Sequence, residues 1–340
     1  MNPYQNLFIY FFSGTGNAFS VARWIKENVE KENINITLIS IEKLDNFKQQ
    51  QPNDKSLIAF AYPTHGFAPP WIMIKFLWKF PRIVNADVLF VNTKAGAKVW
   101  KFYFPGMTGL AQWLSIFIFW CKGYPVVGSL PLDMPHSWTS FFPPNTNKAV
   151  NPMTERCHRI VNKMCSRIFA GKKYFRYTVW TQLWFDILVS WIVPLYVFIG
   201  RFFLAKTLFS SYKCNSCRIC EEYCPVNAIE IRKGMPYWKI TCESCMRCMN
   251  ICPKRSIQSW VTRICLVSYG LIVLGLTLTN LNIFWLFLII CVLFFPIYWL
   301  FIKFVHLKLV NILFTYTSLT RFWKRYFAPG VKIKEFKKNK

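Results

Sequence analysis

Acidic residues and histidines are scarce in this chain of 340 residues, with 15 Asp and Glu together and 4 His. Charged residues make up only 17% of the sequence, whereas 54% of it is hydrophobic and 19% aromatic. Part of the chain is therefore expected to meet lipid. No Ser-His-Asp, Cys-His or paired-carboxylate arrangement rises above chance, so hydrolysis finds no support. The length exceeds what a single core usually fills, and more than one domain is expected.

The shortage of acidic residues leaves a formal net charge of +27, because Lys and Arg number 42. Such a charge attracts an anionic partner, which could be a membrane leaflet, an acidic redox protein or a nucleic acid. No nucleic acid is expected, because no motif that reads DNA or RNA is present and the charge is spread along the chain. Anionic membrane lipid and a redox partner protein are the expected partners, although a solvated basic surface explains part of the charge.

The N-terminus also lacks the marks of a secretory leader, since it has no basic segment and no cleavable apolar stretch. We therefore expect the 13 cysteines to face a reducing cytosol rather than to form disulfides. Eight of them follow a metal-ligand pattern. The others are expected to be small buried apolar residues: Cys121, Cys157, Cys165, Cys265 and Cys291.

Strand and helix patterns alternate through the first half of the chain. Residues 7–12 are an all-apolar run, typical of a strand buried on both faces of a parallel sheet, and residues 19–31 have helical periodicity. Further strands are predicted at 36–40, 56–61, 88–92 and 125–128, and further helices at 71–80, 110–120 and 154–169. The pattern predicts an α/β domain with a doubly wound parallel sheet over residues 1–175.

A glycine-containing loop follows the first predicted strand and precedes the first helix. It consists of Ser13, Gly14, Thr15, Gly16, Asn17 and Ala18. Backbone amides and hydroxyls at a helix N-terminus attract phosphate. The loop has neither the lysine of a Walker motif nor the third glycine of a dinucleotide motif, which favours the phosphate monoester of FMN. The alternative is an ordinary glycine turn in a domain that has lost its cofactor.

Eight cysteines form two copies of one motif, and the copies are 28 residues apart. Cys214, Cys217, Cys220 and Cys224-Pro225 recur as Cys242, Cys245, Cys248 and Cys252-Pro253. This is the spacing of bacterial proteins with two [4Fe-4S] clusters, in which the fourth cysteine of each motif ligates the other cluster. One cluster is thus predicted on Cys214, Cys217, Cys220 and Cys252, and the other on Cys242, Cys245, Cys248 and Cys224. Structural zinc is the alternative, but zinc ligands usually come as two separated pairs.

Two long apolar stretches follow the cysteine motifs. Residues 264–279 and 283–302 each approach the roughly 20 residues that a transmembrane helix needs. Basic residues flank both ends, so the positive-inside rule predicts a hairpin with both ends in the cytoplasm. The alternative is a pair of buried helices in a soluble core. A third stretch, residues 187–200, is too short for a span and contains Pro194, which favours an interfacial or re-entrant segment.

Ser13, Thr15 and Gly16 match the fingerprint of the flavodoxin family, and this part of the chain resembles that family. Ala18 stands where the family has a final threonine, which removes one hydroxyl from the phosphate site. The resemblance implies that two loops flank the isoalloxazine ring of FMN: Pro63, Thr64, His65 and Gly66 after the third strand, and Thr93, Lys94, Ala95 and Gly96 after the fourth. With Pro69-Pro70-Trp71 after the first of these loops, residues 7–257 resemble the EFR-type ferredoxins, in which a flavodoxin-like domain is fused to a ferredoxin domain.

These patterns predict five regions in a membrane-associated variant of that family. They are a flavodoxin-like domain (1–175), an apolar connector (176–212), a ferredoxin domain with two [4Fe-4S] clusters (213–258), a transmembrane hairpin (259–305) and a basic cytoplasmic tail (306–340). The expected function is electron transfer between FMN and the clusters on the cytoplasmic side of the inner membrane. One alternative is an oxidoreductase that reduces a quinone or another small acceptor. Another is a redox sensor or assembly factor whose clusters are structural.

Overall fold

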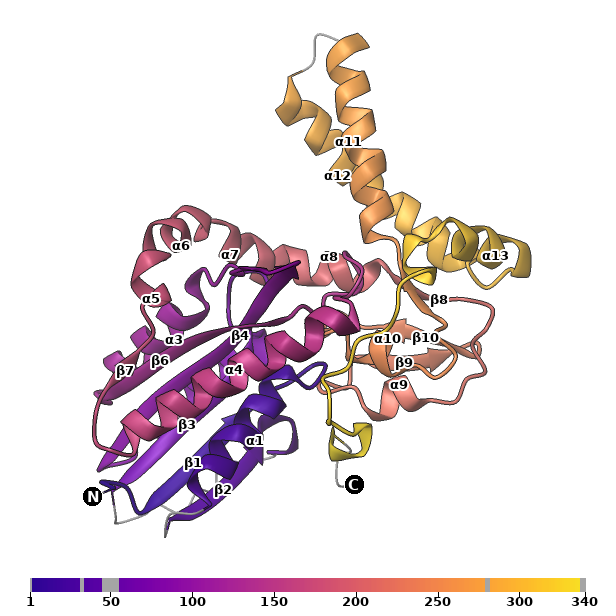
Figure 1. Ribbon diagram of the computed structural model, residues 1–340. Coiled ribbons are helices and arrows are strands. Elements are labelled where there is room, and N and C mark those ends of the chain that lie inside the picture. The colour runs from indigo at the N-terminus through magenta and orange to yellow at the C-terminus, as the bar shows by residue number, and fades with distance from the viewer. Residues whose placement is uncertain (1, 31–33, 45–54, 279–281, 337–340) are drawn as a thin grey trace. The chain divides into compact units, whose positions relative to one another are not determined.

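The structure is a computed structural model that describes residues 2–30, 34–44, 55–278 and 282–336 (Figure 1). The chain folds into two compact units. Unit 1 consists of residues 1–137, 145–201 and 326–340, and unit 2 consists of residues 138–144 and 202–325. The stretches predicted as a connector (176–212) and a basic tail (306–340) are therefore each divided between the two units.

A parallel sheet forms the centre of unit 1. Its strands are β1 (Asn6–Phe11), β2 (Asn35–Ser40), β3 (Ser56–Pro63), β4 (Ala86–Val99), β6 (Val126–Pro135) and β7 (Tyr174–Phe175). They lie in the order β2-β1-β3-β4-β6-β7, and β5 (Phe102–Phe104) adds an antiparallel pairing to the end of β4. The order of the five long strands is that of the flavodoxin-like doubly wound fold. The predicted fold class of this part of the chain is confirmed.

Two pairs of helices cover the sheet. Helix α1 (Asn17–Val29) packs with α4 (Asn147–Ile168), and α2 (Trp71–Lys79) packs with α3 (Leu110–Cys121). The predicted helices are confirmed, but α4 begins at Asn147 rather than at residue 154. Its first turns contain Pro152. Because proline usually stands at or before the start of a helix, the sequence pattern does not indicate that the helix begins before this residue.

The apolar stretch after β7 is broken into short helical pieces. These are α5 (Thr178–Thr181), α6 (Leu183–Val189), α7 (Ile192–Leu195), the π-helical turn η2 (Tyr196–Gly200) and α8 (Arg201–Lys206). Val193 and Val197 pack against Ala68 in unit 1. Asp186 is buried and accepts a hydrogen bond of 2.8 Å from the backbone amide of Gly109. One face of the segment is therefore attached to unit 1.

Unit 2 is built around two small antiparallel pairs. Strand β8 (Leu208–Ser210) pairs with β11 (Ile257–Ser259), and β9 (Ile229–Arg232) pairs with β10 (Met235–Trp238). The short helices α9 (Ile219–Glu222) and α10 (Arg247–Ile251) lie between them. Residues of both pairs, including Ile229, Trp238 and Ile257, form one core with the cysteines.

Two apolar helices continue unit 2. Helix α11 (Val261–Leu278) lies beside α12 (Ile283–Phe304), and a Cβ at Gly275 would come within 2.7 Å of the Leu286 side chain. The segments α13 (Lys308–Thr317), η3 (Leu319–Arg321) and η4 (Ile333–Phe336) follow, and η1 (Ile41–Lys43) lies earlier in the chain. Many of the apolar side chains of α11 and α12 are exposed.

By length and hydropathy, no single helix among the described residues qualifies as a membrane span. The pair Leu183–Val189 and Ile192–Lys206, bent by 48°, meets the criterion only when its two parts are taken together. The turn of the predicted hairpin, residues 279–281, lies outside the described residues. The transmembrane hairpin therefore stays a prediction.

The cysteines outside the two motifs differ in their surroundings. Cys157 and Cys165 are buried as predicted, and burial raises the pKa of both thiols to about 12. The prediction is wrong for Cys121 and Cys265, which are exposed. Cys121 is the last residue of α3 and Cys265 lies on the outside of α11, so neither meets a neighbouring element that would cover it. The side chain of Cys291 lies outside the described residues.

Candidate functional site

The two cysteine motifs of unit 2 have the same backbone. Ser216, Arg218 and Asn227 have φ values of 54°, 60° and 52°, and the residues 28 positions later, Ser244, Met246 and Arg255, have values of 49°, 59° and 48°. Positive φ is uncommon for residues other than glycine. Three such residues recurring at one offset show that the sequence repeat is also a structural repeat.

One set of four cysteines lines a single small cavity. Cys214, Cys217 and Cys220 come from the first motif, and Cys252 comes from the end of the second. Pro236 and Ile257 complete the apolar part of the lining. The structure therefore brings together the four residues that the crossed pattern assigns to one cluster.

The remaining four cysteines are also neighbours. The thiols of Cys245 and Cys224 act electrostatically on Cys242, and those of Cys242 and Cys245 act on Cys248. Burial is the larger influence, and it raises the pKa of both Cys242 and Cys248. In the first set, burial and the thiols of Cys214 and Cys252 raise the pKa of Cys220 to about 12. Thiols with such pKa values stay protonated at neutral pH, so binding iron must displace their protons.

Nearby hydrogen-bond donors point at the sulfur atoms. The amide of Ala228 donates to Cys224 Sγ at 3.2 Å, and that of Ser244 donates to Cys242 Sγ at 3.4 Å. Cys252 Sγ lies 3.2 Å from Ser256 Oγ. Such donors stabilise thiolate sulfur and tune the potential of a cluster held there. The residues present therefore fit a [4Fe-4S] cluster in each set. Within the described ranges, no group of three or more His, Cys, Asp or Glu side chains is arranged to hold a single metal ion.

The buried side chain of Arg247 is a feature of this site that the motif pattern did not indicate. It is 1% exposed, and its Nη1 donates to the carbonyl oxygen of Tyr223 at 3.1 Å. Tyr223 precedes Cys224, so a cation lies beside the second set of cysteines. A lone arginine between two cysteines looks like any surface residue in the sequence, and only the folded chain reveals its burial.

The loop after β1 is covered by the C-terminal part of the chain. Every residue from Ser13 to Ala18 is buried, and Gly16 has a φ of 101° at the start of α1. Asn17 Nδ2 donates to the carbonyl of Pro135 at 2.7 Å, and Asn17 Oδ1 accepts from the Tyr326 hydroxyl at 2.6 Å. The amide of Ala328 donates to the carbonyl of Thr15 at 2.9 Å.

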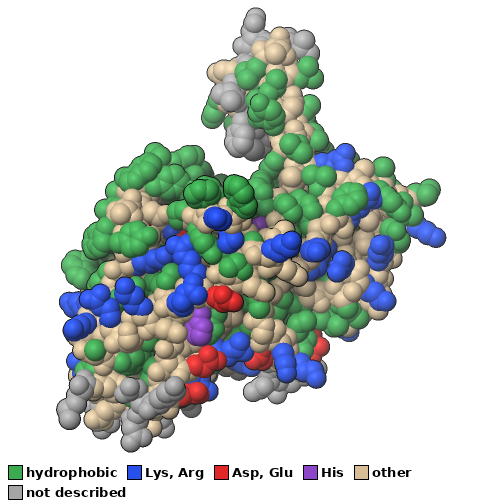
Figure 2. Space-filling view, in the orientation of Figure 1, with side chains coloured by type: hydrophobic (Ala, Val, Ile, Leu, Met, Phe, Trp, Pro, Cys, Tyr) green, Lys and Arg blue, Asp and Glu red, His purple; other side chains and the backbone are tan. Residues whose placement is uncertain are grey.

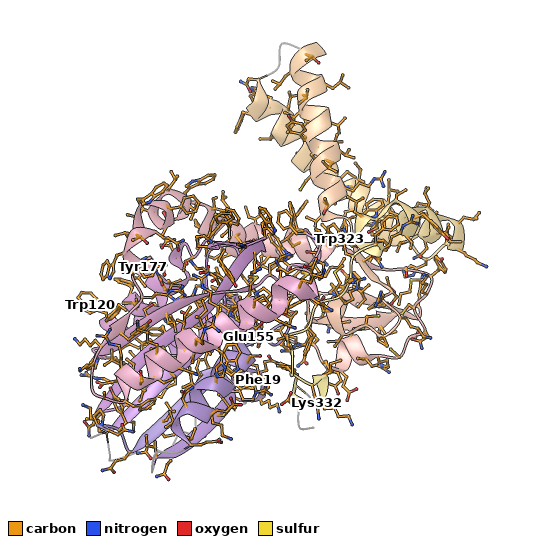
Figure 3. All side chains as sticks on the ribbon, in the orientation of Figure 1. Phe19, Trp120, Glu155, Tyr177, Trp323 and Lys332 are labelled. Atoms are coloured by element: carbon orange, nitrogen blue, oxygen red, sulfur yellow. The ribbon has the colours of Figure 1, made fainter. Side chains whose placement is uncertain are left out.

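The covering segment also contacts the first turns of α1. The ring centroids of Phe19, labelled in Figure 3, and Phe336 are 5.5 Å apart. A Cβ on Gly16 would lie 2.8 Å from the Cβ of Ala328. Glycine at this position therefore serves the close approach of the segment as well as the left-handed turn.

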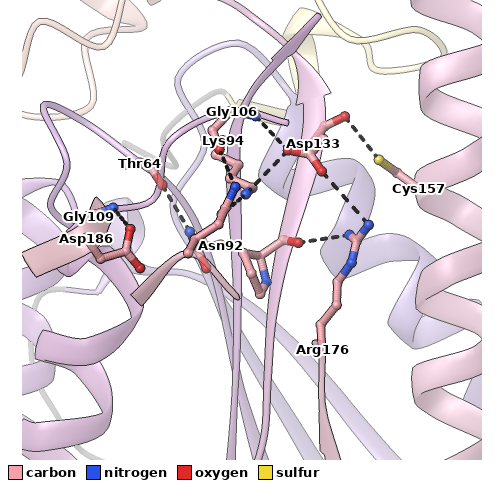
Figure 4. Close-up of polar contacts among 11 residues, drawn as sticks. Thr64, Asn92, Lys94, Gly106, Gly109, Asp133, Cys157, Arg176 and Asp186 are labelled. Carbon is pink, nitrogen blue, oxygen red and sulfur yellow. Dashed lines mark hydrogen bonds and ion pairs between the residues drawn. The ribbon is translucent and has the colours of Figure 1, made fainter. Parts of the chain in front are cut away.

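The two loops predicted to flank a flavin ring are closed by contacts within unit 1. Thr64 Oγ1 accepts from Asn92 (Figure 4), and the backbone of His65 pairs with that of Ala68. A Cβ on Gly66 would overlap the Tyr196 ring. Pro63 ends β3. The prediction of a loop at residues 93–96 is wrong, because Thr93, Lys94, Ala95 and Gly96 continue β4 and pair with β6.

Lys94 lies in a buried ionic network rather than facing solvent. Its Nζ is 3.5 Å from Asp133, which also lies 3.9 Å from Arg176 (Figure 4). The Nζ donates to Gln182 as well, at 2.6 Å. Burial lowers the pKa of Lys94, although the negative charge of Asp133 opposes this shift. The sequence pattern indicated Lys94 but neither Asp133 nor Gln182, which lie 39 and 88 residues further along the chain.

The residue types of the β1 loop suit a phosphate group. In this structure, however, the segments around the loop leave no room for FMN. The loop is buried beneath the C-terminal segment, and Tyr196 lies against the glycine of the first ring loop. The residues present therefore do not fit FMN in this arrangement, and both covering segments would have to move before it could bind.

Comparisons with known proteins support the ferredoxin motif directly. Residues 209–230 match the family model of the 4Fe-4S binding domain, and this range contains Cys214, Cys217, Cys220 and Cys224. The chain therefore contains a 4Fe-4S domain of the ferredoxin type. No curated protein matches the chain.

Among solved structures, several flavodoxins are similar to unit 1. Oxidised flavodoxin 1 from Bacillus cereus is 14% identical, with 47% of this chain and 97% of that chain covered and a TM-score of 0.33. A flavodoxin from the domain Archaea is 16% identical, with 48% and 98% covered and a TM-score of 0.30. The flavodoxin of Streptococcus pneumonia TIGR4 is 13% identical, with 47% and 98% covered and a TM-score of 0.32. With identities and TM-scores this low, the fold assignment rests on the strand order.

Proposed function

We propose that this chain is an electron carrier that binds two [4Fe-4S] clusters in unit 2. The observation that carries the proposal is the repeated backbone of the two motifs, together with the cavity that Cys214, Cys217, Cys220 and Cys252 line. A bound [4Fe-4S] cluster supplies the transfer of one electron at a time. The protein holds the sulfur ligands, directs amide donors at them and covers them with Ile229, Trp238 and Ile257.

The test is anaerobic purification followed by iron and sulfide counts and an absorption spectrum. We expect about eight irons and eight sulfides per chain, with reversible bleaching by dithionite. A colourless protein, or one that contains zinc in place of iron, would refute the proposal. Clusters that cannot be reduced and reoxidised while the protein stays folded would instead indicate a structural role.

The proposed place of action is the cytoplasmic side of the inner membrane. Exposed apolar side chains on α11 and α12 support this location, because monomeric soluble proteins rarely expose an apolar patch of that extent. Arg263 stands near the start of α11 and Lys303 near the end of α12, as the positive-inside rule requires for a hairpin with cytoplasmic ends. A reporter fused after Lys340 should be active only in the cytoplasm, and activity outside it would rule out the hairpin topology.

A flavin-dependent reaction is the second candidate, because unit 1 has the flavodoxin-like strand order and the β1 loop has the residue types of a phosphate site. Oxidation of such a flavin by a quinone or another small acceptor would make the chain an oxidoreductase. The test measures flavin in the purified chain and in Tyr326→Phe, which loosens the cover over Asn17. FMN bound by either protein supports this candidate, and none in both with excess FMN rejects it.

A further inference from the structure

Unit 1 has a basic groove formed largely by one side of α4 and the strand that follows it. The groove has a volume of about 660 Å³, and its basic lining includes Arg156, Arg159, Lys163, Arg167 and Lys173. Figure 2 shows basic side chains gathered on this face of unit 1. Among the described residues, Arg159, Lys163, Arg167 and Lys173 form no ion pair. Their charge is therefore available to an anionic partner.

A stripe of exposed apolar side chains begins at the edge of this groove. Its members recur at helical spacing along the broken helix from α5 to η2: Tyr177, Trp180, Trp184, Trp191, Leu195 and Phe198. Leu195 is the least exposed of them, at 49%. On the other side of the segment, Val179, Val189 and Val193 are buried in unit 1. The segment is therefore attached by one face and presents the other to the surroundings.

Tyr177 joins the two features, because it lines the groove and is also the first member of the stripe. It lies on the outer side of unit 1 in Figure 3, and the hydrophobic band over α5 to α7 adjoins the basic side chains in Figure 2. Tryptophan and tyrosine are enriched where a bilayer meets water. Basic side chains next to an apolar helix face are the pattern of segments that lie in the plane of an anionic membrane.

We propose that unit 1 binds the surface of a membrane that contains anionic phospholipids. In this arrangement the basic groove takes lipid headgroup phosphates, and the aromatic stripe enters the boundary between headgroups and acyl chains. An acidic protein would match the charge of the groove but would leave three exposed tryptophans in water. The inference extends the proposed membrane location, but it depends neither on the hairpin nor on the clusters.

The experiment uses the full chain in nanodiscs of phosphatidylcholine, with and without phosphatidylglycerol, and follows hydrogen exchange of residues 177–200. We expect these residues to exchange more slowly when phosphatidylglycerol is present. The double variant Arg159→Gln/Lys163→Gln should lose this difference, whereas Lys26→Gln/Lys43→Gln, with the same change of charge outside the groove, should keep it. A difference that survives the groove substitutions, or no difference in the native chain, would overturn the proposal.

A second measurement separates this interaction from the hairpin. Vesicle flotation compares the same proteins on phosphatidylcholine alone and on its mixture with phosphatidylglycerol. If the hairpin does not anchor the chain, vesicles of phosphatidylcholine alone will not bind the protein. Binding to the mixture then measures the affinity of unit 1 for anionic lipid. Neutralising two groove residues should weaken that binding about 25-fold, because each basic residue near an anionic surface contributes about fivefold. Trp184→Ser should also weaken it, and unchanged binding of both variants would contradict the proposal.

Discussion

The two sets of cysteines differ in exposure, although both motifs have the same backbone. The set of Cys214, Cys217, Cys220 and Cys252 lies nearer the surface of unit 2 than the set of Cys242, Cys245, Cys248 and Cys224. Cys217 is exposed, with Cys214 and Cys220 partly exposed, whereas Cys242 and Cys248 are buried. The difference comes from the residues around the ligands. Met249 and Asn250, between Cys248 and Cys252, are buried. Thr139, from the excursion of residues 138–144 into unit 2, donates a hydrogen bond to Asn250 at 3.2 Å.

The comparison teaches that ligand spacing fixes the shape of a cluster site, while the residues between and beyond the ligands fix its environment. Partners approach a cluster most closely where its ligands reach the surface. The site on Cys214, Cys217, Cys220 and Cys252 is therefore expected to exchange electrons with a partner. The buried site is expected to have a different potential, because burial and nearby charge both tune it.

The largest expected effect comes from Cys252→Ser, which removes the ligand that the second motif supplies to the site near the surface. Iron should fall from about eight to about four per chain, and the remaining cluster should be the buried one. Iron analysis and electron paramagnetic resonance of the reduced protein measure this. Cys265→Ser, an exposed cysteine outside the motifs, is the control and should retain all the iron. Loss of the buried cluster instead would mean that the ligand sets do not cross, and full iron content would mean that Cys252 is not a ligand.

Arg247→Met should lower the reduction potential of the buried cluster. The substitution removes a buried positive charge that stabilises the more negative reduced state, and the shift should be on the order of tens of millivolts. A redox titration followed by electron paramagnetic resonance measures it. Arg218→Met is the matched control, because Arg218 is 69% exposed and pairs with Glu221 at 2.7 Å. Equal shifts in the two variants would show that burial does not distinguish the two sites.

The smallest expected effect is that of Thr139→Val, which removes the hydrogen bond to Asn250 above the buried motif. We expect a loss of about 1 kcal/mol in the free energy of unfolding of the iron-loaded protein, measured by urea denaturation. Ser216→Ala serves as its counterpart in the first motif, since the exposed Ser216 hydroxyl donates to the carbonyl of Gly234. Its cost should be smaller, because water replaces the lost partner. A larger cost for Ser216→Ala would reverse the comparison.

Much of the fold was predictable because its signals are local. The apolar run of residues 7–12, the helical period after it and the later strands report their own conformation, and together they indicated the parallel sheet that the strand order confirms. The start of α4 was missed because Pro152 ordinarily marks a helix boundary. The exposure of Cys121 and Cys265 was missed because it depends on which neighbours cover a helix, and a sequence pattern does not contain those neighbours.

The sequence by itself determined the cysteine ligands, their 28-residue repeat and the residue types of the loop after β1. These features are local, because they depend only on residue type and on spacing along the chain. Only the tertiary structure decided that Arg247 is buried beside one set of cysteines and that residues 326–336 cover the β1 loop. It also decided that Lys94 and Arg176 both pair with Asp133 and that an aromatic stripe adjoins a basic groove. These features join residues far apart in the sequence, and burial and charge pairing depend on distance in space.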